Sequence, residues 1–358
     1  MAQQLFPTTS FATLAQSLSE PFAPFDDEAA DAARQHQQHL TKPLGALGRL
    51  EDIAIFMAGW QGTSMPRAEH TQIIVFAGNH GVCAQGVNVY PQDVTQQMVA
   101  NFCAGGAAIN QLADLCNARV KIVPLELDHP TADITMTNAM SEEETLDALA
   151  VGYGAVDREA DILVLGEMGI GNTTVAAALA TAIFGGSPAD WVGPGTGADA
   201  EGLARKKAAV KAACARLDKS AHEPSDPATP LHILAAVGGR EQAALIGACL
   251  AAREARIPLL LDGFIVTASL SVLAAAGAKL TPSQNLLAHC LAGHVGAEPG
   301  HAPLLRKLNL NPILDLGMCL GEGSGAALAL PIIKAAIATH TGMSTFAQAS
   351  VSDRDAPR

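Results

Sequence analysis

The sequence has 358 residues, of which 49% are hydrophobic and 16% charged, and its formal net charge is -13. This composition predicts a core-rich globular protein of one large domain, or of one large and one small domain, and excludes a disordered chain. The acidic balance argues against nucleic acid or an anionic membrane as a partner. A bound phosphate would therefore need a local cluster of donors.

The cysteines and the apolar segments indicate a cytoplasmic protein. The seven cysteines are scattered without a CxxC pair, which predicts reduced and mostly buried thiols. The N-terminus lacks the basic start and apolar run of a signal peptide. The apolar stretch from Gly325 contains Pro331 and Lys334 and is too short to span a bilayer.

Residues 1–65 are expected to be helical. Acidic residues cluster at the start of the segment 26–40, as a helix N-terminus favours, and residues 42–45 then break the helix. Apolar residues return at helical spacing between 47 and 57. We predict a small helical domain over 1–65, completed by part of the C-terminal helices. We predict that a large catalytic domain follows over 66–330, and then a C-terminal helix and tail over 331–358.

From residue 71 onward, short β-branched runs alternate with Ala-rich helical stretches. This alternation predicts a Rossmann-like α/β fold, in which helices cover both faces of a mostly parallel sheet. Ligands of such sheets bind at the C-terminal ends of the strands. A polar, Pro-rich loop is predicted at 220–230. The predicted strands are 72–77, 120–125, 161–165, 233–237, 257–262 and 312–316, and the predicted helices are 94–104, 174–184, 201–217, 241–255 and 325–339.

The glycine-rich segment 166–174, GEMGIGNTT, follows a predicted strand and opens a predicted helix. Such a loop can direct several backbone N–H groups at one anion, and the helix N-terminus adds partial positive charge. Asn172 stands where a Walker A motif has its lysine, so ATP hydrolysis is not expected and a monophosphate fits better. A tight turn capped by threonine, without a ligand, is the alternative.

A second glycine-rich loop, VGPGTGAD at 192–199, leads into a helix that carries Arg205, Lys206, Lys207 and Lys211. A cation from this helix would neutralise a phosphate dianion. A solvated helix face is the alternative, and it is favoured for any single lysine of the helix.

A third loop, LGEGSGAA at 320–327, formally matches the dinucleotide fingerprint GxGxxA. A Rossmann unit needs a further strand and an acidic residue about 20 positions on, and only a helix and a polar tail follow here. What remains is Glu322, a carboxylate between glycines at a strand end. In a partly dry site its raised pKa would suit a general base. A helix N-cap acid is the alternative.

The fourth segment runs from FAGNHGV (76–82) to GVNVYPQDVTQQM (86–98). Tyr90 could support a flat ligand and Gln97 could contact its edge, although ordinary turn and helix packing explains both residues. His80 could be catalytic, but a buried, hydrogen-bonded loop histidine is the favoured interpretation. The spacing of His289, His294 and His301 does not place three imidazoles on one helix face, so no metal site is predicted.

Nine segments together resemble the nicotinate-nucleotide:5,6-dimethylbenzimidazole phosphoribosyltransferase family, which makes the lower-ligand nucleotide of cobalamin. They occur in a consistent order over nearly the whole chain, and GEMGIGNTT combined with LGEGSGAALA is the most specific part. The matching segments are 42–54, 76–82, 86–99, 165–174, 192–199, 238–248, 259–269, 293–301 and 314–331.

The resemblance implies transfer of the phosphoribosyl group from nicotinate mononucleotide to dimethylbenzimidazole, giving α-ribazole phosphate and nicotinate. It implies no metal or other cofactor, small-molecule substrates and a homodimer. Glu322 would be the catalytic base and Glu167 the second acid at the reaction centre. Lys206, with Lys207 as the alternative, would meet the phosphate. The other implied residues are Gly169, Gly171, Asn172 and Thr173 at the phosphate, and Tyr90, Gln97, Met168, Leu320 and Gly321 at the base.

Two other function classes are compatible with the separate loops. A nucleotide-dependent dehydrogenase is disfavoured, because no acidic partner follows the GxGxxA loop. A non-catalytic module that binds a nucleotide or base would need the pocket but not two carboxylates. Asp262, at the end of a predicted strand, would either orient ribose or cap the next helix.

Overall fold

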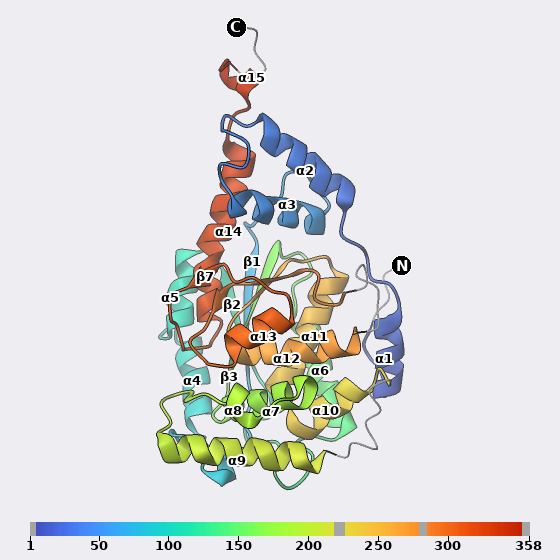
Figure 1. The fold of residues 1–358 in the computed structure, drawn as a ribbon, viewed down its shortest axis with the longest axis vertical. Coiled ribbons are helices and arrows are strands. Elements are labelled where there is room, and N and C mark those ends of the chain that lie inside the picture. Colours follow the sequence, from blue (N-terminus) through green and yellow to red (C-terminus); the bar gives the residue numbers. More distant parts are fainter. Residues whose placement is uncertain (1–4, 218–225, 279–284, 353–358) are drawn as a thin grey trace.

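The computed structural model describes residues 5–217, 226–278 and 285–352, so the loop predicted at 220–230 lies outside it up to residue 225. Within these residues, five parallel strands form the central sheet in the order β2-β1-β3-β4-β5, and two short parallel strands pair separately. Figure 1 shows helices around this sheet. The strands are β1 (Thr71–Ala77), β2 (Arg119–Pro124), β3 (Ile162–Met168), β4 (Leu259–Leu261), β5 (Cys290–Ala292), β6 (His294–Val295) and β7 (Leu314–Asp315).

Most helices connect consecutive strands, as a parallel sheet requires. The helices are α1 (Phe11–Ser19), α2 (Asp27–His39), α3 (Arg49–Gln61), the 3₁₀ turn η1 (Gly81–Gln85), α4 (Val94–Cys103), α5 (Ala108–Leu115), α6 (Glu142–Ala155), α7 (Asn172–Phe184), α8 (Pro188–Trp191), α9 (Ala200–Arg216), α10 (Thr229–Val237), α11 (Arg240–Glu254), α12 (Phe264–Ala276), α13 (His301–Lys307), α14 (Ser324–Gly342) and α15 (Phe346–Ala349).

Both faces of the sheet are buried along β1, β3 and β4, as their apolar runs predict, whereas the edge strand β2 is partly exposed. Along β1, Ile73 and Val75 belong to one hydrophobic cluster, whereas Ile74 and Phe76 belong to the other. This alternation follows from the two-residue period of a strand. The first cluster includes α3, α5 and α14, and the second includes α6, α7, α10, α11 and α12. The predicted α/β fold with a covered parallel sheet is confirmed.

The helices from the chain ends meet beyond one end of the sheet. Figure 1 shows α2, α3 and the C-terminal half of α14, which we call the terminal lobe, projecting from the body that contains the sheet. Gln37 of α2 lies 2.7 Å from the ring of His340 in α14. α1 lies apart from this lobe, and its buried Phe11 and Leu14 join the core of the body. α14 runs without interruption across residue 330, where the predicted domain boundary lies.

Two predicted strands are wrong in type or place. Residues 233–237 belong to α10, because Pro230 occupies its first turn and Leu231, Leu234 and Ala235 are buried on the helix. Residues 312–316 contribute only β7, which pairs with β6 outside the central sheet. The fifth strand of the central sheet is β5, which the sequence did not suggest.

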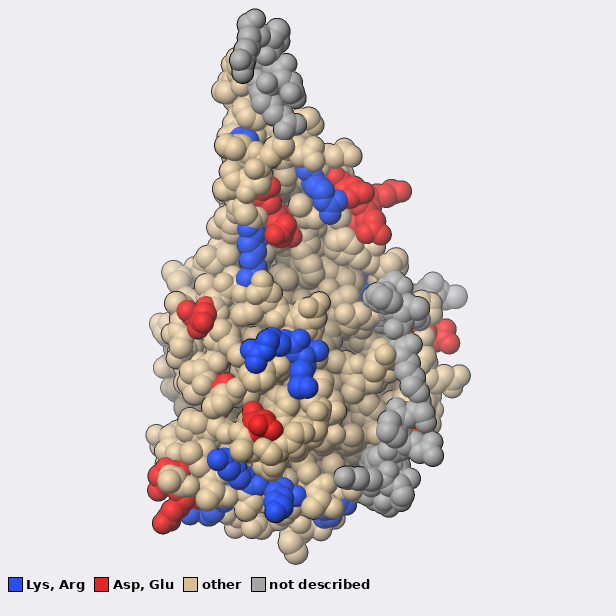
Figure 2. Space-filling view, viewed as in Figure 1, with Lys and Arg blue, Asp and Glu red and all other residues tan. Residues whose placement is uncertain are grey.

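The surface carries the basic helix noted in the sequence, but the prediction of mostly buried thiols is wrong, because four of the seven cysteines are half-buried or exposed. Figure 2 shows Lys and Arg side chains gathered along the edge formed by α9, which carries the basic residues noted in the sequence. All seven cysteines are free, and Cys116, Cys249 and Cys290 are buried. Among the described helices, none combines the length and hydrophobicity needed to cross a bilayer.

Candidate active site

A pocket opens at the C-terminal end of β3, where the glycine loops gather. Its walls come from five separate chain segments, in agreement with the rule that ligands of parallel sheets bind beyond the strand ends. The lining residues are Glu167–Ile170, Asn172, Thr173, Gly195, Thr196, Gly263–Ile265, His294, Gly296, Glu298 and Met318–Glu322.

Glu167 and Glu322 both line this pocket, and both are buried, with 5% and 6% of their surfaces exposed. Their proximity arises from backbone contact between β3 and the third glycine loop. A Cβ added to Gly166 would lie 2.5 Å from the carbonyl carbon and oxygen of Glu322. A Cβ on Gly321 would lie 2.7 Å from Oε1 of Glu167. Glycine at both positions therefore lets the two loops touch.

Glu322 has a backbone conformation that is unusual for a residue with a side chain. Its φ is +64°, in the left-handed region, between Gly321 at +86° and Gly323 at +83°. A non-glycine residue there costs on the order of 1–2 kcal/mol. Within the described residues, Oε2 of Glu322 is buried without a hydrogen-bond partner. The loop thus holds Glu322 in a strained backbone conformation, with one carboxylate oxygen unpaired at the pocket wall.

Asp262 supports the Glu322 loop from behind. Its Oδ2 accepts a hydrogen bond from Gly323 N at 3.1 Å, and its Oδ1 accepts one from Ala326 N at 2.9 Å. The carboxylate is 1% exposed and lies at the N-terminus of α14, where backbone N–H groups need acceptors. His294 Nε2 lies 3.3 Å from Asp262 Oδ1. Of the two roles predicted for Asp262, capping is the one its contacts show, and the capped helix is α14.

Burial and neighbouring carboxylates raise the pKa values of Glu167 and Glu322. Burial first, and then the carboxylates of Asp262 and Glu241, raise the pKa of Glu167 well above its ordinary value, against the hydrogen bond that Asn172 donates. Burial and Asp262 also raise the pKa of Glu322, although a backbone hydrogen bond from Ile109 opposes this. Both shifts follow from placing like charges in a poorly solvated site. Two carboxyl groups with raised pKa values in one pocket mark a candidate catalytic centre.

The loop at 169–171 is held by its neighbours before α7 begins at Asn172. Gly171 has φ of +92°, and Ile170 N donates to Oγ1 of Thr95 in α4 at 3.1 Å. A Cβ on Gly169 would lie 2.6 Å from the carbonyl oxygen of Gly78, so only glycine fits there. The side chain of Asn172 donates a hydrogen bond to Glu167. This bond connects the glycine loop at 169–171 to the two glutamates.

A buried lysine reaches this region from α9. Lys206 is 3% exposed and donates to Gly193 O at 3.0 Å, whereas Lys207 is exposed. A Cβ on Gly195 would lie 2.8 Å from Lys206 Nζ and 3.1 Å from Thr173 Oγ1, so the lysine and the threonine flank one glycine. Burial lowers the pKa of Lys206, and the nearby Glu298 carboxylate opposes that shift.

Most predicted site residues come together, and four do not line the pocket. Glu322, Glu167, Gly169, Asn172, Thr173, Met168, Leu320 and Gly321 line it. Lys206 reaches its edge at Gly195, and Gly171 serves as the N-cap of α7. Tyr90 and Gln97 both lie at the surface. Tyr90, which is 50% exposed, precedes α4, and Gln97 lies on α4.

The pocket is also lined by residues that were not predicted as part of the site, among them Phe264, His294 and Glu298. Phe264 begins α12 after β4, and His294 and Glu298 lie in the segment 293–301. The strand end at Asp262 and the Gly- and His-rich segment GHVGAEPGH were the sequence signals that could have suggested them. His80, which was expected to be buried, is fully buried with Nε2 3.1 Å from Glu241 Oε1.

Comparison with known proteins gives the family. Residues 22–351 match a family described as Phosphoribosyltransferase. The chain is 54% identical over 345 residues to the nicotinate-nucleotide–dimethylbenzimidazole phosphoribosyltransferase of Novosphingobium aromaticivorans, covering 96% of this chain and 98% of the relative. It is 55% identical over 332 residues to the protein of that name from Ruegeria pomeroyi, covering 92% and 95%. The crystal structure of CobT from Thermus thermophilus is 43% identical, has a TM-score of 0.81, and is matched over 99% of its length by 91% of this chain. The chain therefore belongs to the nicotinate-nucleotide–dimethylbenzimidazole phosphoribosyltransferase family.

Proposed function

We propose that this protein transfers the 5-phosphoribosyl group of nicotinate mononucleotide to 5,6-dimethylbenzimidazole or a related azole, giving α-ribazole 5′-phosphate and nicotinate. The observation that carries this proposal is the pairing of two buried carboxyl groups, Glu167 and Glu322, in one pocket beside the glycine loop. The names of the relatives support the choice of substrates.

The reaction exchanges one C–N bond at C1′ for another. As the bond to nicotinate breaks, its electrons neutralise the pyridinium ring, and positive charge develops on the ribose. The carboxylate of Glu167 stabilises that charge. The azole nitrogen forms the new bond, and the proton that the azole loses goes to Glu322. A single displacement inverts C1′, so a β donor yields an α product.

The positive pyridinium ring of the donor explains how a protonated Glu167 becomes ionised in the complex. Burial and the neighbouring carboxylates raise the pKa of Glu167 in the free protein. The bound pyridinium nucleotide brings positive charge into the pocket, and an opposite charge favours the ionised carboxylate. Substrate binding is therefore expected to release a proton from the acidic centre and prepare it for the oxocarbenium-like transition state.

The phosphate end of the donor is assigned to the loop at 169–173 and to Lys206. Backbone N–H groups at the start of α7 suit an anion, and the side chains of Asn172 and Thr173 add donors. Lys206 adds one positive charge beside Thr173. Met168, Leu320 and Gly321 give the base an apolar wall. Tyr90 and Gln97 would contact the base only after α4 moves or the base extends beyond the pocket.

The direct test is incubation with nicotinate mononucleotide and dimethylbenzimidazole, followed by mass detection of α-ribazole phosphate. Glu322→Gln should lower kcat by about 10²- to 10⁴-fold, the contribution of a general base. Glu143→Gln, an exposed acid in the first turn of α6, is the control and should leave kcat unchanged. Nucleotide binding without product in the unmodified protein would instead establish a non-catalytic module.

The pH profile gives a second check on Glu322. A base must be ionised to accept a proton, and burial raises the pKa of this carboxyl. kcat should therefore fall on the acidic side at a pH above the ordinary glutamate range. An acidic limb that stays unchanged in Glu322→Asp and Glu322→Gln would assign the titration to another group.

We further infer a cytoplasmic homodimer with a small helical domain, on the basis of the family resemblance. The terminal lobe is the part that corresponds to the expected small domain. Sedimentation equilibrium of the purified chain tests the oligomeric state, and a monomer at micromolar concentration would contradict it.

A further inference from the structure

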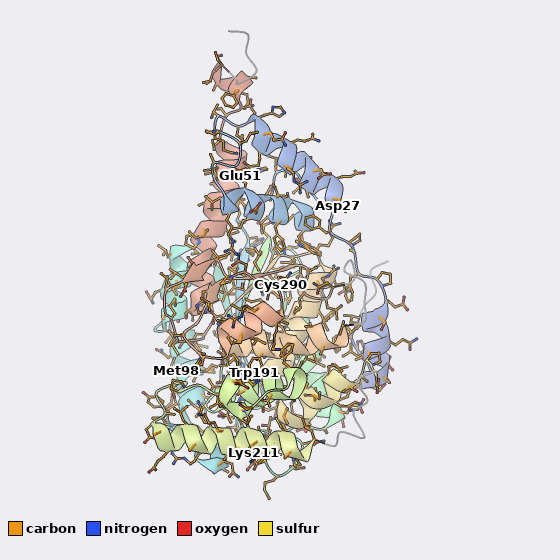
Figure 3. The ribbon with its side chains drawn as sticks, in the orientation of Figure 1. Asp27, Glu51, Met98, Trp191, Lys211 and Cys290 are labelled. Carbon is orange, nitrogen blue, oxygen red and sulfur yellow. The ribbon has the colours of Figure 1, made fainter. Side chains whose placement is uncertain are left out.

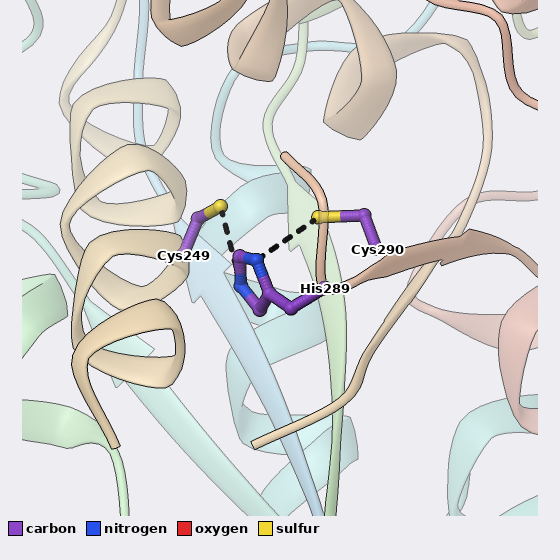
Figure 4. A group of neighbouring side chains, drawn as sticks. All are labelled: Cys249, His289 and Cys290. Carbon is purple, nitrogen blue, oxygen red and sulfur yellow. Dashed lines mark hydrogen bonds between the residues drawn. The ribbon is translucent and has the colours of Figure 1, made fainter. Parts of the chain in front are cut away.

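A cluster of two thiols and an imidazole lies away from the proposed active site. Figure 4 shows His289 between Cys249, which lies on α11, and Cys290, which begins β5. Cys249 Sγ is 3.9 Å from His289 Nε2, and Cys290 Sγ is 3.9 Å from His289 Nδ1. All three residues are buried, and none of them lines the pocket that contains Glu322. Figure 3 shows Cys290 in the interior, between the terminal lobe and α13.

We propose that Cys249, His289 and Cys290 form a binding site for a zinc ion that links α11 to the edge strand β5. Among the described residues, they are the one group of three or more His, Cys, Asp or Glu side chains whose ligand atoms gather in this way. One ligand atom from each residue lies within 4.8 Å of the other two.

The spacing suits a tetrahedral ion. With Zn–S bonds of about 2.3 Å and Zn–N bonds of about 2.0 Å, ligand atoms around zinc are separated by about 3.5–3.8 Å. The observed atoms lie within 4.8 Å of one another, so shifts of about 1 Å complete the geometry. Two cysteines and one histidine form a known zinc donor set that leaves the fourth position for water.

The charge balance permits an ion in this buried place. Two thiolates neutralise a divalent cation, so the complex adds no net charge to the core, whereas a lone buried cation would be very unfavourable. Arg253, one helical turn after Cys249, interacts electrostatically with both thiols. Its Nε is buried without a hydrogen-bond partner in the described part of the chain.

The surroundings place the ion where α3 packs against the body. The ring of Trp60, in α3, lies 5.9 Å from the His289 ring, and the Arg253 guanidinium lies 4.7 Å above the Trp60 ring. α3 belongs to the terminal lobe, while α11 and β5 belong to the body. An ion at Cys249 and Cys290 would therefore fix the wall on which Trp60 packs, and it would not take part in the transfer reaction.

The experiment uses the full chain, treated with a chelator under reducing conditions and then dialysed against Zn²⁺. We expect uptake of one equivalent of zinc, measured by mass spectrometry of the metal. We also expect the melting temperature to rise by about 3–4 °C at free zinc of 100 times Kd, given the length of the chain. Cys249→Ser should lose that equivalent, whereas Cys116→Ser, a buried thiol outside the cluster, should retain it.

Co²⁺ provides a readout that does not depend on folding of the variants. In the unmodified chain it should give thiolate-to-cobalt absorption bands and tetrahedral d–d bands, which Zn²⁺ displaces. Absence of these bands, or zinc uptake that is equal in Cys249→Ser and the parent, would overturn the proposal. Mass analysis that finds Cys249 and Cys290 joined as a disulfide in the freshly isolated protein would overturn it as well.

Discussion

Gly166→Ala should separate folding from catalysis, because it acts on the contact that places Glu322. The new Cβ would lie 2.5 Å from the carbonyl carbon and oxygen of Glu322 and from Gly323 N, about 0.9 Å short of the 3.4 Å at which ordinary contact begins. All three atoms are backbone, so the loop itself must move. A displacement of about 1 Å at a catalytic group costs on the order of 100-fold in rate.

The same substitution should destabilise the protein only moderately. Overpacking costs about 1–3 kcal/mol, and ~2 kcal/mol lowers the melting temperature of a chain this long by about 3 °C. Gly154→Ala in α6 is the matched control, because its Cβ would meet nothing within 4 Å. That variant should keep full activity and gain slightly in stability. If Gly166→Ala folds and its kcat stays within threefold of the parent, contact with Gly166 does not position Glu322.

Three further changes test the electrostatics of the site. The raised pKa of Glu167 means that, between the ordinary and the raised value, the folded state binds more protons than the unfolded state, so stability falls as pH rises. Glu167→Gln should therefore melt higher than the parent at pH 7–8, converge with it below pH 4, and lose turnover; melts across this range check the sign. Lys206→Met should raise KM for nicotinate mononucleotide about 10- to 100-fold, as for a lost bond to a charged group, whereas exposed Lys207→Met should not. Asp262→Asn leaves one of two buried N–H groups without an acceptor, so we expect kcat to fall and stability to drop by about 1–3 kcal/mol in denaturant titrations.

The sequence predicted β1, β2, β3 and β4 of the central sheet, and it missed β5. β1 and β3 are each seven residues long and include β-branched side chains. Their positions were predicted within a few residues. β5 has three residues and no periodic pattern, and its pairing with β4 depends on tertiary contacts. Residues 233–237 look equally apolar, but the helix start at Pro230 decides their structure.

The candidate site could be predicted where a loop carries its own signal. Glycines beside Glu322 and Glu167 indicated close approach of backbone, and the structure shows that approach at Gly166 and Gly321. The proposed zinc cluster gave no such signal. Cys249 is 40 residues from His289 in the sequence, and the two residues meet only because α11 packs beside the start of β5. The three histidines considered together do not form one group, since His294 pairs with His301 at a ring distance of 5.9 Å.

The acidic centre lowers the stability of the free protein, and this loss of stability indicates a catalytic function. Glu167 and Asp262 are buried with like charges nearby, and Glu322 adopts a left-handed conformation that glycine would adopt without strain. A site selected for stability alone would have an amide at position 167 and glycine at position 322. Binding of the donor places its pyridinium charge beside these carboxylates and offsets the repulsion, so the protein should be most stable when its donor is bound. The strain and the repulsion thus favour the step in which positive charge develops at C1′, which is the step that the two glutamates are placed to assist.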